Sequence, residues 1–328
     1  MTQSSYFPVH IAGFGLCSAH DMKTLDALRA IATDQSAKIR HPVFVGADGL
    51  KQLCAPVPSC VKERNTIARV SHLAIKAQNK LGKAGRSPAL SFLLLPSLLG
   101  PRSPLYPETQ KAIQDRAFGF EPDHIVFGGS STAANLMRVI ARSLSIGEAK
   151  NCMLVCADTF VSPFMLDILE ANGLSYTRSR THTPVPGEMG VALFFRPAKP
   201  GNTMPGQTLT DLQVGSEMEN PEEPNRGLLG RASVAPLQAL GDVPEGTKLV
   251  IDTDGPRHKA EELGVILSSS ATIKDTDLVS PSTSIGTVGC ATLPMALGLS
   301  AGLIRDGAPC VVSWICGEEN ERILVRVD

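Results

Sequence analysis

The sequence has almost no net charge, because 31 Lys and Arg residues are balanced by 32 Asp and Glu residues. Such a chain lacks the basic surface that binds nucleic acids, so we exclude that class of function. It also lacks a long apolar run, since Ser91, Pro96 and Ser97 interrupt the longest one, residues 90–99; we expect no membrane span. The N-terminus shows no basic stretch followed by an apolar core. We therefore expect no signal peptide and a cytoplasmic protein.

Paired cysteine motifs are absent as well. None of the eight cysteines belongs to a Cys-x-x-Cys pair, and several lie inside apolar segments. This usage is typical of buried free thiols and not of a metal site or a disulfide framework. We expect neither a metal nor a cofactor. The cysteines are at positions 17, 54, 60, 152, 156, 290, 310 and 316.

The chain is long and apolar enough for a large core. With 328 residues, of which 43% are hydrophobic, it can bury one core or two fused halves. Residues 196–207 contain three prolines and two glycines, a composition typical of a linker. We place the boundary there, with an N-terminal half over residues 1–200 and a C-terminal half over residues 201–328.

A turn of small residues, a helix and a strand follow one another in the first half. Residues 128–135 are mostly small and lead into apolar residues at helical spacing as far as Leu144. This pattern predicts a buried helix whose N-terminal amides face a site. Residues 152–158 then form a short apolar run, typical of a strand buried on both faces. We expect further strands over 10–15, 89–96, 208–214 and 249–251, a helix over 64–83, and a loop with a short helix over 160–174.

The chain also contains an internal repeat. A shift of 160 residues places Gly129, Ser130 and Thr132 over Gly289, Cys290 and Thr292, and it superimposes the helix 136–144 on 296–304. The apolar segment 153–155 then lies near 311–313. A repeat of this length indicates two similar packed halves and not a solenoid, whose period is shorter.

Five segments in this order resemble motifs of the β-ketoacyl synthase family, and the resemblance spans nearly the whole chain. It implies an α/β, thiolase-like fold of two similar halves with a layered α-β-α-β-α architecture. The segments are the helix-opening turn 128–135 with Gly147-Glu148-Ala149, the strand-like 186–193, Val250 to Gly255, Ser280 to Thr287, and Ser313 to Asn320.

At each position where the family keeps a catalytic side chain, this sequence has another residue. The resemblance places Ser130 at the nucleophilic cysteine and Asp254 at the first active-site histidine. Ser282 replaces the lysine and Thr287 the second histidine. Cys316 stands where a gatekeeping aromatic residue is usual. We therefore assign no residue a confident catalytic role.

These substitutions remove what condensation requires. A serine hydroxyl is a poor nucleophile without a positioned base. A carboxylate at Asp254 would repel the oxyanion that neutral donors normally stabilise. Only a protonated Asp254 could donate a hydrogen bond, and burial is the one effect that would protonate it. We expect no condensing activity.

Within this family, the resemblance implies a partner role. A member without the cysteine typically pairs with an active ketosynthase, as the chain-length factor does in polyketide and polyene systems. We therefore expect a non-catalytic subunit in fatty acid or polyketide biosynthesis, as a homodimer or as a heterodimer with an active ketosynthase. An acyl carrier protein would be a further partner. We expect the dimer interface at residues 125–127 together with 152–156.

Two alternatives remain open. The chain could be a thiolase-like scaffold or adaptor unrelated to acyl chemistry, for example one that is accessory to a secretion apparatus. A filled pocket would mark that case, and the small Ser282, Thr287 and Cys316 do not predict one.

The second alternative is a Ser130-dependent acyltransferase. It would need His124, His182 or His258 nearby in space, and Asp254 with His258 could form an acid and base pair. The plainer interpretation is that Ser130, or equally Ser131, only caps its helix. Likewise Cys290, which opens the second repeated helix, is either a displaced nucleophile or, as we favour, a small core residue.

Overall fold

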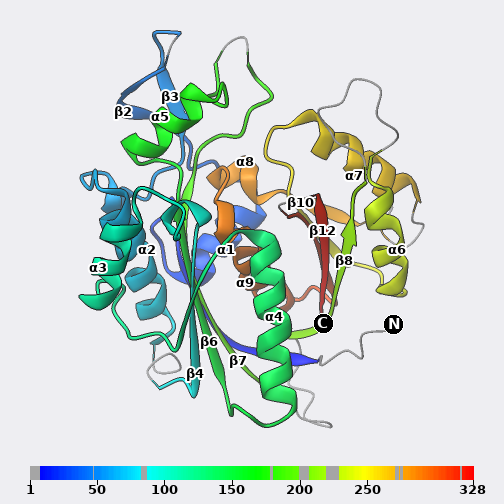
Figure 1. Ribbon diagram of the computed structural model, residues 1–328. Helices are drawn as coiled ribbons and strands as arrows, with labels where there is room; N and C mark the ends of the chain where they lie inside the picture. Colours follow the sequence, from blue (N-terminus) through cyan, green and yellow to red (C-terminus); the bar gives the residue numbers. More distant parts are fainter. Residues whose placement is uncertain are drawn as a thin grey trace.

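The computed structural model describes residues 8–46, 48–82, 87–177, 180–198, 207–218, 229–269, 273, 276–317 and 320–328. Within these ranges, ten strands form one sheet in the order β10-β9-β11-β12-β8-β1-β7-β6-β4-β5 (Figure 1). The strands of the first half are β1 (Val9–Cys17), β4 (Leu90–Leu95), β5 (His124–Phe127), β6 (Cys152–Thr159) and β7 (Glu188–Pro197). Those of the second half are β8 (Thr208–Ser216), β9 (Lys248–Ile251), β10 (Asp277–Val279), β11 (Val311–Cys316) and β12 (Glu321–Val327).

The two halves have the same strand pairing. In the first, β4 is parallel to β5 and β6, β6 is antiparallel to β7, and β7 is antiparallel to β1. In the second, β9, β10, β11, β12 and β8 repeat this arrangement. In the sheet, the halves join where β1 lies beside β8, at the residue pairs Val9 with Leu209 and His10 with Thr208, and an isolated bridge pairs Pro186 with Thr287. The internal repeat predicted from the sequence is therefore confirmed.

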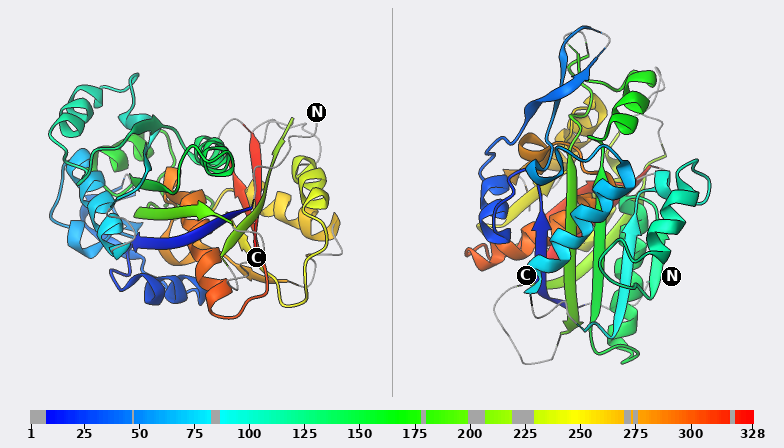
Figure 2. Two further views of the ribbon diagram at one scale, coloured as in Figure 1. Left: turned by 90° about the horizontal axis from the view of Figure 1, so that it is seen from below. Right: turned by 90° about the vertical axis from the view of Figure 1, so that its left-hand side faces the viewer.

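The helices complete five layers (Figure 1). Helices α4 (Ser130–Ser145) and α9 (Thr292–Arg305) lie between the two groups of strands, and α1 (Thr24–Ala32) packs on α9. Helix α2 (Thr66–Lys80) crosses the outer face of the first group beside α3 (Tyr106–Gln114), as Figure 2 shows. Helices α6 (Arg231–Ala239) and α7 (Arg257–Ser269) cover the second group. This is the predicted α-β-α-β-α architecture.

The remaining elements lie at the ends of the sheet. They are α5 (Pro163–Ala171), α8 (Pro281–Ile285), three 3-10 turns (Pro58–Cys60, Ser97–Leu99 and Gly289–Ala291), and the hairpin of β2 (Ile39–Val45) and β3 (Lys51–Cys54). The hairpin projects beside α5 (Figure 1). In the part of the chain that is described, no helix is both long enough and apolar enough to cross a membrane.

The apolar core forms three clusters that match these layers. The middle cluster combines both halves, including Ile140 of α4, Leu193 of β7 and Leu297 of α9. The two outer clusters lie under α2 and under α6 with α7. Because the middle cluster draws on both halves, neither half buries its inner face without the other.

The predicted strands and helices agree with the structure to within a few residues. Segment 160–174, expected as a loop with a short helix, contains α5. The proposed boundary cannot be placed in the same way, because β7 ends at Pro197 and residues 199–206 lie outside the described ranges. The division at residue 200 remains a prediction.

One buried ion pair joins a helix to a strand in each half. In the first half, Arg69 of α2 binds Glu188 of β7, with Nε 2.5 Å from Oε2. In the second half, Arg322 of β12 binds Glu262 of α7 at 2.5 Å. The helix supplies the cation in one half and the anion in the other.

Candidate functional site

The candidate site is formed where strands of the second half end. Strands β9, β10 and β11 are parallel, so their carboxyl ends lie at the same edge of the sheet. The first turn of α4 reaches this edge from the first half, because a Cβ on Gly317 would lie 2.3 Å from Ser131 Oγ. The glycine is therefore required for the close approach of α4 to the end of β11.

The turn before α4 holds Ser130 in a buried position. The N–H of Gly128 donates to the carbonyl of Leu95 at 2.9 Å, and a Cβ on Gly128 would lie 1.9 Å from Thr132 Oγ1. The N-cap of α4 is Gly129, and no side chain caps the helix. The capping interpretation of Ser130 and Ser131 is therefore wrong, since both are the first residues of the helix itself.

A buried lysine occupies the centre of the site. Lys259 Nζ of α7 lies 2.7 Å from Asp254 Oδ1 and 3.2 Å from Asp252 Oδ2. Thr287 Oγ1 donates to Asp254 Oδ2 at 2.9 Å, and the N–H of Cys316 donates to Asp252 Oδ2 at 3.2 Å. The side chains of Asp252, Asp254 and Lys259 are 9%, 6% and 13% exposed. We call these five residues the lysine cluster.

The electrostatics of the cluster follow from burial. Burial raises the pKa of Asp252, and Lys259 opposes this effect while Asp254 adds to it. Burial alone would lower the pKa of Lys259, but the two carboxyl groups raise it above its usual range. Burial likewise raises the pKa of the Cys316 thiol far above neutrality. Lys259 therefore remains an ammonium, and Cys316 is not a thiolate nucleophile.

Contacts with the first half position Thr287. Its N–H donates to the carbonyl of Val185 at 2.8 Å, and its carbonyl accepts from the N–H of Gly187 at 3.0 Å. The preceding Gly286 has φ +69°, and a Cβ there would lie 2.5 Å from the Val185 oxygen. Only glycine fits this conformation and this contact. The segment 186–193, predicted as part of the fingerprint, thus supports the site.

The structure brings four of the five predicted positions together. Asp254, Thr287 and Cys316 belong to the lysine cluster, and Ser282 Oγ donates to the carbonyl of Thr253 at 2.5 Å. Ser130 comes from α4 and, in the described ranges, hydrogen-bonds to none of them.

Lys259 and Asp252 were missed from the sequence. Asp252 follows a predicted strand and Lys259 begins a helix, but nothing in their spacing indicates that they meet.

The histidines do not assemble a catalytic pair with Ser130. His124 is exposed at the start of β5, where it stacks on Phe92, and His182 is exposed as well. His258 lies beside the cluster on α7, and burial lowers its pKa. The expected pair of Asp254 and His258 is not formed, because the carboxylate of Asp254 binds Lys259 and Thr287 instead.

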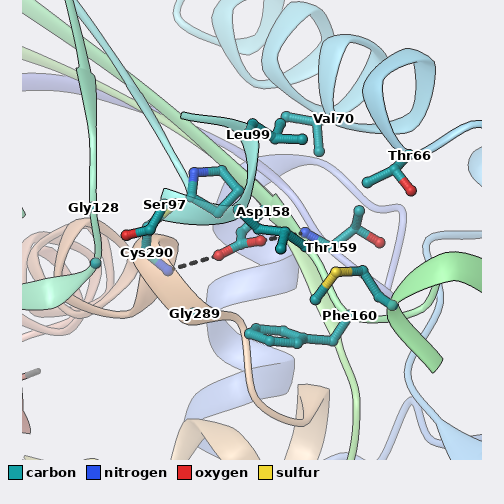
Figure 3. A pocket seen from close by; sticks show the side chains of 14 residues that line it. Thr66, Val70, Ser97, Leu99, Gly128, Asp158, Thr159, Phe160, Gly289 and Cys290 are labelled. Carbon is teal, nitrogen blue, oxygen red and sulfur yellow. Dashed lines mark hydrogen bonds between the residues drawn. The ribbon is translucent and has the colours of Figure 1, made fainter. Parts of the chain in front are cut away.

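Two cavities differ in size. One of about 10 Å³ lies against Asp252, Ser282 and Thr287; it holds one water molecule at most. The small residues at 282 and 287 therefore leave little open space beside them. The other, of about 210 Å³, lies beside Gly128 and Gly129 (Figure 3). Apolar side chains of Val70, Leu98, Leu99, Phe160 and Met165 line it.

Cys290 lies at the wall of the larger cavity and is buried. Its N–H donates to Asp158 Oδ2 at 2.9 Å, drawn as a dashed line in Figure 3, and its Sγ lies 3.4 Å from Cys156 Sγ. Burial raises the pKa of the Cys290 thiol well above its usual value. Cys290 is therefore a buried core residue, as we favoured from the sequence, whose thiol carries little thiolate at neutral pH.

Comparisons with known proteins agree on the fold. No protein-family model matches the chain, and no curated protein matches its sequence. Solved structures do match over almost its whole length. The ishigamide ketosynthase/chain length factor covers 98% of this chain and 99% of its own, with 12% identity and a TM-score of 0.67. A type II polyketide synthase acyl-carrier protein in complex with its ketosynthase bound to the hexaketide covers 98% of each chain, with 9% identity and a TM-score of 0.71.

A third match is the ketosynthase from module 6 of the bacillaene synthase from Bacillus subtilis 168. It covers 98% of this chain and 72% of its own, with 11% identity and a TM-score of 0.66. Identities this low establish a fold and not an activity. The chain has the thiolase-like fold of the ketosynthases, as the five degraded motifs and the duplicated strand order both indicate.

Proposed function

We propose that this protein is a catalytically silent ketosynthase-like subunit that pairs with an active ketosynthase, in the manner of a chain-length factor. It would act in fatty acid or polyketide biosynthesis by shaping the acyl site of its partner. An acyl carrier protein would then deliver the acyl chain to the pair.

The lysine cluster is the observation that carries this proposal. Condensation needs free neutral donors aimed at a thioester oxygen. Here the Thr287 hydroxyl donates to Asp254, and the ammonium of Lys259 is engaged by two carboxyl groups. The remaining space of about 10 Å³ leaves no room for a thioester. These features support a site that has lost its chemistry and kept its scaffold.

One of the two edges of the sheet is the surface we propose for pairing. Strand β5 ends the strand order opposite β10, and a groove of about 550 Å³ is lined by His124 of β5, by Leu90 and Phe92 of β4, and by the C-terminal part of α4. Val139 and Ile146 of this groove are 47% and 59% exposed, which is unusual for apolar side chains gathered in one place. We call this surface the β5 groove.

One part of the expected interface is wrong. Residues 152–156 belong to β6, which lies between β4 and β7 with every residue buried. A strand with hydrogen-bonded neighbours on both sides has no free edge for a partner. Of the two segments expected at the interface, only 125–127 lies at the edge of the sheet.

The larger cavity supports the proposal that the protein shapes an acyl site. Its apolar lining suits a methylene chain, whose burial is favourable by about 0.8 kcal/mol per CH₂ group. It lies beside the turn that opens α4, where the resemblance places the acylated cysteine. An acyl chain could therefore lie along this wall without being bonded to Ser130.

Purification of the tagged protein from its own cells tests the proposal. We expect a ketosynthase that retains its cysteine to copurify in one-to-one amount. Val139→Glu and Ile146→Glu should reduce recovery at least about tenfold, because each buries a charge in the interface. Val43→Glu is the matched control, since Val43 is 69% exposed on the distant β2 hairpin and should leave recovery unchanged.

Recovery of the protein alone, or of unrelated partners, would refute the pairing. The intact mass of the same sample tests the transferase alternative. An acyl adduct that disappears in Ser130→Ala would show that Ser130 reacts, and would replace the proposal by an acyltransferase.

The filled space around Lys259 also favours a second candidate, the thiolase-like scaffold unrelated to acyl chains. Both candidates lack condensing activity, but only the chain-length-factor role needs the larger cavity. Gly129→Leu would fill that cavity from its wall. A change in the acyl products of the copurified partner is expected for the first role, and none for the scaffold.

A further inference from the structure

Two buried thiols meet at the wall of the larger cavity, and the proposed function uses neither. Cys290 Sγ lies 3.4 Å from Cys156 Sγ. Cys156 belongs to β6 of the first half, and Cys290 belongs to the 3-10 turn Gly289–Ala291 that leads into α9 of the second half. The two cysteines are 134 positions apart in the sequence. Among the described residues, no other pair of cysteines has a sulfur–sulfur contact of this kind.

The pair differs in access to the cavity. Cys290 lines the 210 Å³ space, whereas Cys156 does not. Both residues are fully buried from bulk solvent or nearly so, at 2% and 0% exposure. A small neutral molecule that enters the cavity therefore meets its wall at Cys290, whose sulfur lies 3.4 Å from that of Cys156.

We propose that Cys290 and Cys156 form an oxidisable dithiol site that reacts with hydrogen peroxide or a similar small hydroperoxide entering through the larger cavity. In the first step Cys290 sulfur attacks one peroxide oxygen, the O–O bond breaks, and the sulfenic acid of Cys290 forms with release of one water molecule. In the second step Cys156 sulfur attacks that sulfur and displaces its hydroxyl as a second water. Peroxide is reduced and the two thiols are oxidised to one disulfide.

Neighbouring groups restrict how the turn can move during this reaction. The N–H of Cys290 is held by Asp158 Oδ2 at 2.9 Å, and a Cβ on Gly289 would lie 2.1 Å from the same oxygen. The turn is thus fixed to β6 at the backbone of Cys290 itself and two residues from Cys156. The sulfurs need only shorten their contact from 3.4 Å to bonding distance, about 2.0 Å.

Because the disulfide would link the two halves beside the cavity, oxidation should stiffen the cavity wall. Burial raises the pKa of the Cys290 thiol, so little thiolate is present at neutral pH and the reaction is expected to be slow. The site is therefore suited to sustained oxidative conditions and not to rapid signalling.

The native protein, treated with excess hydrogen peroxide for hours, provides the test. A non-reducing peptide map should join the peptides containing Cys156 and Cys290, and the mass of the joined species should be two hydrogens less than the sum of the two peptides. Dithiothreitol should separate the two peptides again. The thermal midpoint of the oxidised protein should be higher than that of the reduced protein, because the crosslink closes a long loop in the unfolded chain.

Variants separate the two steps. In Cys156→Ala the reaction should stop at the sulfenic acid of Cys290. This adds one oxygen to the peptide containing Cys290, and dimedone should trap the sulfenic acid. Cys290→Ala should gain neither modification. Cys17→Ala is the matched control, since Cys17 is equally buried, and it should oxidise like the native chain. Circular dichroism verifies folding, and Cys→Ser at the same positions replaces any alanine variant that fails to fold.

Absence of the two-hydrogen loss in folded protein, or its persistence in Cys290→Ala, would overturn the proposal. A disulfide mapped to Cys17 and Cys60 would do the same. None of these results depends on a ketosynthase partner, so they neither support nor refute the proposed pairing.

Discussion

Individual buried charges determine the electrostatics of the lysine cluster. Asp252 and Asp254 would repel each other in a buried environment, and Lys259 from the next helix compensates both. A buried cation between two carboxyl groups is stable only while all three are present. The substitution of a histidine by Asp254 is thus linked to a lysine that the resemblance does not contain.

Lys259→Met should lower the free energy of unfolding by about 3–5 kcal/mol, because it leaves buried carboxylates without a counter-ion. Urea denaturation measures this loss. Lys248→Met is the control: Lys248 forms an ion pair with Asp277, which is 75% exposed, so the change should cost at most about 1 kcal/mol. Equal effects of the two substitutions would contradict the assigned role of Lys259.

The loss of unfolding free energy caused by Lys259→Met should also depend on pH. Burial raises the folded pKa of Asp252, and the substitution removes Lys259, which is the largest effect that opposes this rise. A carboxyl group with a raised folded pKa stabilises the fold below its unfolded pKa and loses this contribution as pH rises through the folded pKa. The deficit relative to the native chain should therefore be smaller near about pH 5 than near about pH 8. A deficit that grows towards acid pH would refute this.

At the scale of elements, helices are tied to the sheet by buried ion pairs with different surroundings. Glu188 also accepts hydrogen bonds from the Val57 N–H at 2.7 Å and from Thr159 Oγ1 at 2.8 Å. Glu262 accepts bonds from Arg322 at both oxygens. Both pairs are bidentate, and the first also belongs to a network, because Glu188 accepts from Val57 and Thr159.

Arg69→Met and Arg322→Met should each cost about 3–5 kcal/mol of unfolding free energy. The double variants should then differ. Arg322→Met with Glu262→Met should recover most of the loss, because an apolar pair replaces a closed ion pair. Arg69→Met with Glu188→Met should recover less, since the Val57 and Thr159 donors lose their acceptor. Chemical denaturation of the four variants measures their unfolding free energies. Equal recovery of unfolding free energy by the two double variants would contradict the prediction.

The approach of α4 to the end of β11 is a second property of elements. Gly317→Ala should destabilise the protein by about 1–3 kcal/mol, because its Cβ would overlap Ser131 Oγ. Adding Ser131→Ala removes that oxygen and should recover part of the loss. Thermal unfolding of both variants measures the effect. No recovery in the double variant would mean that the backbone of Glu321, and not α4, opposes the methyl group.

At the scale of the whole molecule, the shared middle core makes the two halves one folding unit. Leu193 of the first half and Leu297 of the second belong to the same buried cluster. Within the described part of the sheet, the halves share a single strand pair, β1 with β8, in which two residues of each strand are paired, so this cluster, and not the sheet, provides most of the cohesion between them.

The full chain should therefore unfold in one calorimetric transition. Leu193→Ala and Leu297→Ala should each lower the midpoint of that transition, at a cost of about 2–5 kcal/mol. Met22, which is 45% exposed, provides the control as Met22→Ala, with little change expected. Two separate transitions, each sensitive to one substitution only, would show that the halves are independent.

Local pattern predicted individual elements, and the family resemblance predicted the fold. The small turn and apolar helix at 128–144 and the doubly buried strand at 152–158 are each visible within one stretch of chain, because side-chain periodicity reports which faces are buried. The 160-residue repeat becomes visible when two distant stretches are compared. The degraded motifs likewise identified four positions that do meet in the structure.

Only the tertiary structure shows which side chains form the lysine cluster and that β5 is an edge strand of the sheet. Lys259 lies five residues after Asp254, and only the packing of α7 against the sheet turns its ammonium inward to both carboxyl groups. The sulfur contact of Cys156 with Cys290 depends in the same way on two distant elements.

The strand order also excludes β6 from an edge of the sheet, because β6 lies between β4 and β7. Its apolar sequence is compatible with either an edge or a central position and could not distinguish them. Sequence determined which segments fold and in which order, since that depends on local periodicity. Charge compensation, cavity filling and free edges depend on contacts between distant segments, which periodicity does not encode.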